Sequence, residues 1–221
     1  MRLREHKIQG VYTDGKRLYT RSLAPGERPF DERIFKQDGI EYRQWDPRKS
    51  KLAAAIMKGL KDISLEPGQT VLYLGASHGY TPSFVSDILG QEGFIFALDF
   101  APRVVRDLVF VSDKRENMAP VMADANRPES YFHMAGAADF LYQDIAQKGQ
   151  AEIFLKNADR FLKKGAYAFI AVKSKSIDIT RKPGAVFDDV RKKIERELKI
   201  VDYKLLEPFE KDHCVFVCRK E

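Results

Sequence analysis

Three aspartates each end an apolar segment of the chain, and together they could bind one ligand. Asp99 ends GFIFALDF, Asp124 ends MAPVMAD and Asp144 ends AADFLYQD. If these segments are parallel strands, their carboxyl ends share the sheet edge at which such folds bind ligands. There Asp99 could accept hydrogen bonds from ribose hydroxyls and Asp124 from an adenine amino group, although Asp99 could also cap the following helix. Three carboxylates suit a cationic sulfonium ligand better than a polyphosphate.

A loop with two glycines precedes these aspartates. Gly75 and Gly79 lie in LGASHGYT, between a continuous apolar run and a helix-like segment. Glycine permits unusual dihedrals there and lets a ligand approach the backbone. The chain lacks the G-x-G-x-x-G fingerprint of dinucleotide sites and the G-x-x-x-x-G-K-[ST] phosphate loop. These absences favour S-adenosylmethionine over phosphate-bearing ligands, and a plain strand-to-helix turn is the alternative.

The elements that would position these residues alternate along the chain. Apolar, strand-like segments take turns with helix-like segments, which predicts a mostly parallel, doubly wound α/β sheet. The last two strands are joined by only three residues, so they must pair as an antiparallel hairpin. This arrangement resembles the seven-stranded, Rossmann-like methyltransferase fold. The expected strands are 70–76, 93–100, 118–124, 137–144, 165–174, 201–209 and 213–220, and the expected helices are 81–90, 102–115, 150–164 and 184–200.

A smaller region precedes this pattern. IQGVYT-DG-KRLYTR predicts a hairpin that turns at Asp14-Gly15, and GERPF and QDGIEYRQW look like further extended pieces. At Asp46-Pro47 the pattern changes to a helix, which Asp46 could cap. We therefore expect a small β-rich region over 1–46 and an S-adenosylmethionine-dependent methyltransferase domain over 47–221.

Composition narrows the classes of function. The formal net charge is +6 and 44% of residues are hydrophobic, which fits a globular protein whose partner is a polyanion such as nucleic acid. There is no apolar run of membrane-span length and no signal-peptide pattern near the start, so we expect a soluble, intracellular protein without a membrane partner. The two cysteines, Cys214 and Cys218, fit buried apolar positions on one face of a strand. The sequence shows no cluster of metal ligands, and we expect no metal.

Nearly the whole chain resembles the archaeal form of fibrillarin, a family of guide-RNA-dependent 2′-O-methyltransferases. The stretches that carry the likeness are SKLAAAI, VLYLGASHGYT, ALDFAPR, LYQDIAQ, VKSKSID and EKDH. The glycine- and arginine-rich tail of the eukaryotic members is missing, which points to an archaeal cell and a cytoplasmic location. The chain departs from the family at Ser77-His78 and Tyr80, and it has Asp99 where the family usually has Glu.

The resemblance implies a set of site residues. The cofactor S-adenosylmethionine would contact residues that follow three strands and the glycine loop, namely Gly75, Gly79, Tyr80, Thr81, Asp99, Phe100, Asp124, Ala125, Asp144, Ile145, Ala146 and Gln147. The catalytic set would be Lys51, Asp144, Lys173 and His213. Lys173 follows the apolar strand AFIAV, and a crowded or partly buried lysine there could accept or steer the proton of a ribose 2′-hydroxyl. Taken singly, each of these residues could be an ordinary solvated charge or turn residue.

The resemblance also implies partners. We expect the chain to methylate rRNA and possibly tRNA in a box C/D ribonucleoprotein, with guide RNA, target RNA, a Nop-family scaffold protein and a kink-turn-binding ribosomal-type protein. Basic residues over 181–193 are candidates for RNA backbone contacts or for a solvated helix face: Arg181, Lys182, Arg191, Lys192 and Lys193. The rivals are another methyltransferase of the same fold and an RNA-binding module with a degenerate cofactor loop.

Overall fold

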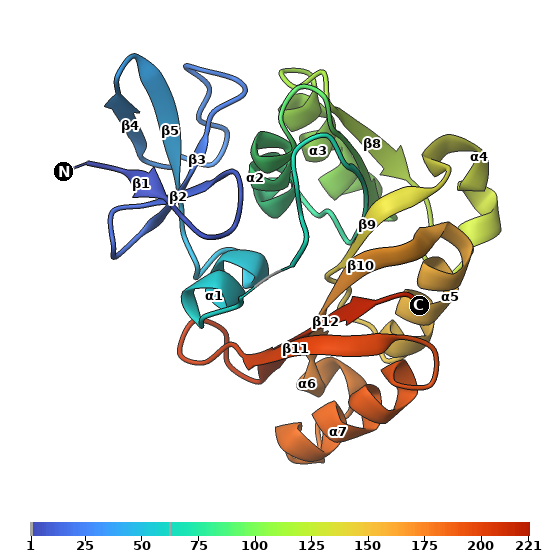
Figure 1. Ribbon diagram of the computed structural model, residues 1–221. Coiled ribbons are helices and arrows are strands. Elements are labelled where there is room, and N and C mark those ends of the chain that lie inside the picture. The colour runs from blue at the N-terminus through green and yellow to red at the C-terminus, as the bar shows by residue number, and fades with distance from the viewer. Residues whose placement is uncertain (1, 62) are drawn as a thin grey trace.

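The computed structural model describes residues 2–61 and 63–221, and it contains two β-sheets and the helices that pack on them (Figure 1). Met1, the first residue of the expected N-terminal region, lies outside the described residues. The larger sheet has the strand order β11-β12-β10-β9-β6-β7-β8. Its strands are β6 (Thr70–Leu74), β7 (Phe94–Asp99), β8 (Met118–Met122), β9 (Ala138–Gln143), β10 (Leu162–Lys173), β11 (Lys199–Leu205) and β12 (His213–Arg219).

The pairing in this sheet confirms the predicted fold class. Strands β6 to β10 pair in parallel, whereas β12 runs antiparallel to both of its neighbours, β10 and β11. The strand order reverses between β6 and β9, so the loops at their carboxyl ends diverge and leave room for a ligand.

Helices cover both faces of the sheet, as the continuous apolar strands predict. Val71 and Tyr73 of β6 pack into one core with α1 (Lys51–Met57), α2 (Tyr80–Leu89) and α3 (Pro102–Ser112). Leu72 and Leu74 pack into a second core with α5 (Gln150–Phe161) and α7 (Pro183–Ile194). The short helices are α4 (Phe132–Ala135), α6 (Ser174–Ile177) and the 3₁₀ turn Pro128–Ser130. No helix in the described ranges is long and apolar enough to cross a membrane.

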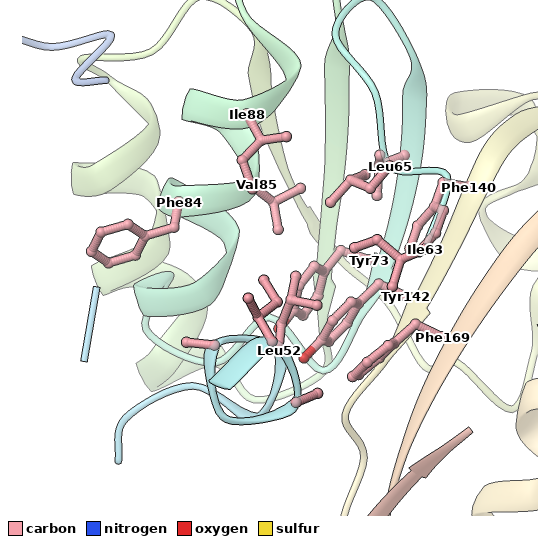
Figure 2. Close-up of a cluster of buried hydrophobic side chains, with 14 of the residues drawn as sticks. Leu52, Ile63, Leu65, Tyr73, Phe84, Val85, Ile88, Phe140, Tyr142 and Phe169 are labelled. Carbon is pink, nitrogen blue, oxygen red and sulfur yellow. The ribbon is translucent and has the colours of Figure 1, made fainter. Parts of the chain in front are cut away.

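Aromatic side chains fill the first core beneath the carboxyl ends of the central strands (Figure 2). The ring of Tyr142 stacks between Tyr73 and Phe169, with centroid distances of 4.1 and 4.7 Å. Leu52 of α1 joins this cluster, so the helix that begins at Lys51 is held against the sheet. Burial of large aromatic rings makes this part of the sheet a rigid base for the residues above it.

The N-terminal region forms its own antiparallel sheet, as expected. It contains β1 (Arg4–Glu5), β2 (Val11–Thr13), β3 (Leu18–Arg21), β4 (Ile34–Gln37) and β5 (Ile40–Trp45), in the order β1-β2-β3-β5-β4. Trp45 stacks on Phe84 of α2 at 5.2 Å and shares the first core. The division of the chain at residue 46 stays a prediction.

Several predicted boundaries were wrong. Helix α1 is capped by Ser50, whose hydroxyl accepts from the Ala53 amide, while Asp46 instead accepts from the Arg48 amide. The hairpin turns through four residues, since Thr13 pairs with Leu18, and GERPF forms turns rather than a strand. Strand β10 starts at Leu162, three residues inside the predicted helix, because Leu162 already pairs with Ala138 of β9. Helix α7 ends at Ile194, and β11 begins at Lys199 rather than at residue 201.

A buried ionic network joins the two sheets. The carboxylate of Asp87 on α2 lies 2.8 Å from Arg43 of β5 and 2.7 Å from Arg115, and it also accepts from the Thr20 hydroxyl of β3. Arg43 reaches Glu32 as well, at 2.6 Å. The side chains of Arg43 and Asp87 are fully buried, so removing either charge would leave the buried charges of this network unbalanced.

We expect Asp87→Ala to lower the free energy of unfolding by about 3–5 kcal/mol, because two buried guanidinium groups would lose their shared carboxylate. Urea denaturation followed by circular dichroism measures this change. Asp113→Ala, at the exposed end of α3, is the control and should change stability by less than about 0.5 kcal/mol. Equal stability of the two variants would show that the network contributes nothing to joining the sheets.

Candidate active site

A pocket of about 240 Å³ lies at the carboxyl ends of the central strands. It is formed by the ends of β6, β7 and β9 and by the loop that follows β8. Three aspartates line it and no lysine or arginine does, a composition that fits a ligand with positive charge, hydroxyl groups and an amino group. Its lining residues are Gly75, Ser77, Leu98, Asp99, Phe100, Ala123, Asp124, Ala125, Asp144, Ile145, Ala146 and Gln147.

Nine of the twelve proposed cofactor contacts lie in this pocket. Of the others, Tyr80 and Thr81 line a second, adjoining pocket of about 490 Å³, which also shares Gly75, Ser77 and Asp144 with the first. Gly79 lines neither pocket. It has a left-handed φ of 91°, and a Cβ there would lie 3.0 Å from the Leu108 side chain, so its role is to let α2 begin close to α3. The cofactor contacts themselves stay predictions.

Gly75 allows the two central strands to meet at the site. Its φ is +82°, and a Cβ on it would lie 2.2 Å from the backbone oxygen of Asp144. The Asp144 amide also donates to the Leu74 carbonyl at 2.9 Å. The glycine is therefore required both by its dihedral and by the close approach of the loop that carries Asp144.

Asp99 holds the glycine loop as well as lining the pocket. One carboxylate oxygen accepts from the Ser77 amide at 2.9 Å, and the other accepts from the Ala101 amide at 3.1 Å. The latter contact closes a turn just before α3, whose N-cap is Ala101 without a side-chain cap, so the capping role considered for Asp99 was wrong. Phe100, the next residue, lines the same pocket and leaves 64% of its surface exposed.

Asn126, which the sequence did not single out, connects two predicted cofactor residues. Its side-chain amide donates to Asp124 at 3.1 Å and to the Gln147 side chain at 3.2 Å. It therefore joins the loop after β8 to the loop after β9 across the pocket. This link depends on the folded positions of two loops, and no local pattern in the sequence indicates it.

Two members of the expected catalytic set, Lys51 and Asp144, form an ion pair. The Lys51 ammonium lies 2.9 Å from the Asp144 carboxylate, and both side chains are about three-quarters buried. Burial alone would lower the pKa of Lys51, but Asp144, together with Glu210, outweighs it and raises that pKa. Lys51 therefore stays charged and fixes Asp144 at the border between the two pockets.

Lys173 and His213 face each other across the β10–β12 pair. They are register partners at the end of that ladder. His213 is nearly buried, with Nδ1 2.6 Å from the Lys211 carbonyl, so Nδ1 carries a proton and donates it there. The Lys173 side chain is exposed rather than partly buried, and its amine has no ion pair or hydrogen bond with any described residue. The crowding expected around Lys173 was therefore wrong.

Glu210 is a further residue that the sequence analysis missed. Its carboxylate lies 3.9 Å from His213 Nδ1, and it also contributes to the raised pKa of Lys51. Glu210 therefore influences both parts of the expected catalytic set, Lys51 with Asp144 and His213 with Lys173. It belongs to the EKDH stretch, and that position was the only available signal for it.

The second pocket lies against the N-terminal region. Tyr80 meets Phe30 edge to face at 5.2 Å, and its hydroxyl accepts from the Asp46 amide at 3.1 Å. Burial raises the pKa of Tyr80 to about 12, so this hydroxyl stays neutral. Thr81 donates to the Ser50 hydroxyl, which caps α1, and this contact connects the glycine loop to the helix that carries Lys51.

The basic residues over 181–193 do not form one free surface. Arg181 pairs with Asp189, and Lys193 pairs with Glu152. The guanidinium of Arg191 lies over the Tyr203 ring at 4.7 Å. Lys182 and Lys192 remain exposed and are the better candidates for RNA contacts within this set.

We expect Asp99→Ala to weaken S-adenosylmethionine binding by about 1–3 kcal/mol, the scale of lost charge-assisted hydrogen bonds. Isothermal titration calorimetry measures the change. Asp139→Ala is the matched control, because Asp139 also accepts from a backbone amide, that of Thr70, at the opposite edge of the same sheet. A folded Asp99 variant with wild-type affinity would remove Asp99 from the site.

The sheet topology and the acidic pocket at its carboxyl edge define the class of S-adenosylmethionine-dependent methyltransferases. Comparisons with known proteins give the family. A family model described as fibrillarin matches residues 3–221. This chain therefore belongs to the fibrillarin family.

Individual relatives match over almost their full lengths. The chain is 47% identical over 223 residues to a fibrillarin-like rRNA/tRNA 2′-O-methyltransferase of Pyrococcus horikoshii, covering 99% of this chain and 98% of that protein. The solved structure of Aeropyrum pernix fibrillarin with natively bound S-adenosyl-L-methionine has a TM-score of 0.91 at 42% identity, covering 99% and 98%. A fibrillarin/Nop5p complex gives a TM-score of 0.90 at 38% identity, covering 97% and 99%.

Proposed function

We propose that this protein carries out guide-RNA-directed 2′-O-ribose methylation of rRNA, and possibly tRNA, within a box C/D ribonucleoprotein. The coarser part follows from its family: the chain is a methyltransferase that uses S-adenosylmethionine. The observation that carries the proposal is the acidic pocket, whose Asp144 pairs with Lys51, together with the Lys173–His213 pair at the end of β10, the strand next to β9. The cationic methyl donor and the hydroxyl group that accepts the methyl group would meet at the border between the two pockets.

In this proposal, different residues of the chain bind the cofactor and take part in methyl transfer. Bound S-adenosylmethionine supplies a methyl group on a positively charged sulfur. Asp99 and Asp124 hold the hydroxyl and amino groups of the nucleoside part, as their free lone pairs allow. Asp144, fixed by Lys51, orients the reacting groups, and the exposed Lys173 amine steers the 2′-hydroxyl and its proton. Alignment of the reactants contributes a large share of the rate, roughly 7–11 kcal/mol in favourable cases.

The partners are proposed from the family. The fibrillarin/Nop5p complex supports a Nop-family scaffold protein as one partner. Guide RNA, target RNA and a kink-turn-binding ribosomal-type protein complete the assembly that we propose, in the cytoplasm of an archaeal cell. The net charge of +6 is compatible with RNA as a partner.

The glycine loop argues against a degenerate cofactor site. Ser77, one of the departures from the family, donates its amide to Asp99, and His78 lies 2.9 Å from Asp107 and outside the first pocket. Neither side chain fills the pocket. Calorimetry with S-adenosylmethionine separates the enzyme from an RNA-binding module, because the module would bind no cofactor.

Reconstitution tests the proposal. Purified chain, Nop-family protein, kink-turn-binding protein and guide RNA are mixed with a target RNA and labelled S-adenosylmethionine, and each component is left out in turn. We expect methyl incorporation only in the complete mixture. Incorporation that persists without guide RNA would contradict guide-directed function.

We expect the isolated chain to bind RNA weakly and in a salt-sensitive manner. The net charge of +6 is a modest excess, and some of the basic side chains are already paired with carboxylates, so the charge available to displace counterions from phosphate is limited. Filter binding at increasing salt concentrations measures this property. Tight, sequence-specific binding by the chain alone would contradict the role of the guide.

A further inference from the structure

The ladder between β9 and β10 stops short of Lys173. The last paired residues are Gln143 of β9 and Ile170 of β10. β9 ends there and its chain turns away into the loop Asp144–Gln147, whereas β10 continues for three residues, paired only with β12 on its other side. The backbone of Lys173 therefore has no strand beside it on the side of the cofactor loop.

The side chain of Gln150 takes the place of that missing strand. Gln150 is the first residue of α5 and is fully buried. Its Oε1 accepts from the Lys173 amide at 3.3 Å, and its Nε2 donates to the Gln147 carbonyl at 2.9 Å. Its own backbone carbonyl accepts from the Gln143 side chain at 2.6 Å. The side-chain amide of Gln150 thus connects the cofactor loop to Lys173, and its backbone carbonyl connects to the end of β9.

We propose that Gln150 is a positioning residue, which sets the distance between Lys173 and the loop that carries Asp144 and Gln147. This inference rests on the proposed function of Lys173. The Lys173 amine has no partner in the part of the chain that the structure describes, so the region that it can reach is set by the position of its backbone. Proton transfer requires donor and acceptor within hydrogen-bond reach, and a small displacement of Lys173 lowers the rate steeply.

The chemistry of the amide explains why glutamine stands at this position. The site needs one acceptor, for the Lys173 amide, and one donor, for the Gln147 carbonyl, in a fully buried space. A primary amide supplies both without charge. A methionine of similar length supplies neither, and a carboxylate supplies only the acceptor.

The first test compares Gln150→Met with Asn117→Leu. Asn117 is also a buried amide, and it donates to the Ser86 and Gly90 carbonyls far from the pocket. Asn117→Leu therefore removes packing and hydrogen bonds comparable to those that Gln150→Met removes. In the reconstituted complex at saturating cofactor, we expect Gln150→Met to lower the single-turnover rate by about 10- to 100-fold. Asn117→Leu should stay within a few-fold of wild type. Equal rates for the two variants would overturn the proposal.

The second test uses Gln150→Glu and the pH dependence of its rate. Burial raises the pKa of a carboxyl group, so at low pH the new side chain is neutral and can still donate and accept. As pH rises it ionises and loses the donor to Gln147. We expect the ratio of the variant rate to the wild-type rate to fall as pH rises, while both proteins stay folded. A ratio that is low at every pH and does not change would contradict the need for a donor and an acceptor together.

Hydrogen–deuterium exchange of the free chain separates this inference from the proposed function. The Lys173 amide should exchange faster in Gln150→Met than in wild type or Asn117→Leu, whether or not any RNA is methylated. Unchanged exchange of the Lys173 amide would show that its hydrogen bond to Gln150 does not protect it, and this result would overturn the proposal. If wild-type complex methylates no RNA but the Lys173 amide loses protection in Gln150→Met, the proposed function fails and the structural link stands.

Discussion

Lys173→Ala should lower the rate of methyl transfer by about 10²–10⁴-fold while cofactor affinity stays close to that of wild type, because a side chain positioned for proton transfer contributes on this scale. Lys173 ends β10 opposite His213 and is absent from the lining of the pocket that we assign to the cofactor. Single-turnover methylation in the reconstituted complex measures the rate, and calorimetry measures the affinity.

Lys175→Ala is the control for that experiment. Lys175 lies two residues further on, and its amine is already held by Asp212 at 2.9 Å. Loss of an exposed ion pair has a small effect, so we expect at most a few-fold change in rate. Near-wild-type turnover of Lys173→Ala would exclude it from the chemistry, and a change confined to cofactor affinity would make it a binding residue.

Gly75→Ala should abolish or greatly weaken cofactor binding. The added Cβ would lie 2.2 Å from the Asp144 carbonyl oxygen and must displace the loop after β9. Strain of this kind is worth up to about 3 kcal/mol, which corresponds to roughly 10²-fold in affinity. Calorimetry with S-adenosylmethionine, after circular dichroism has shown that the variant is folded, measures the effect.

Gly68→Ala is the matched control for Gly75→Ala. Gly68 has the same φ of +82°, but a Cβ added there would have no atom within 4 Å. It therefore isolates the backbone penalty of the left-handed region, about 1–2 kcal/mol of stability, from the steric clash at the site. Similar cofactor affinities in the two variants would show that the approach of Gly75 to Asp144 is unimportant for binding.

The order of the elements was predictable because strands buried on both faces are continuous apolar runs. Val71 to Leu74 face two cores in alternation, and buried residues of β9 and of the second half of β10 do the same. Boundaries were less predictable where tertiary pairing decides them. Lys163 and Lys164 continue the helical pattern of α5 in the sequence, yet they belong to β10 because Leu162 pairs with Ala138.

The residues of the candidate site were also predictable only in part. Residues at strand ends, such as Asp99 and Asp144, could be predicted because parallel strands bring their carboxyl ends to one edge. Gln150 and Asn126 could not, because their contacts join segments that are distant in sequence. Glu210 lies three residues before His213, but its effect on Lys51 arises only in the folded chain. Their residue types are common on helices and in turns, so type and spacing carry no signal of that role.

Mapping the methylated nucleotide tests the central claim most directly. The reconstituted complex is given one target RNA and either of two guides whose pairing is shifted by one nucleotide, and the modified ribose is located by mass spectrometry. We predict a single 2′-O-methyl group that moves by one nucleotide with the guide and disappears in Lys173→Ala. Methylation on a base, or at a position that does not follow the guide, would contradict the account.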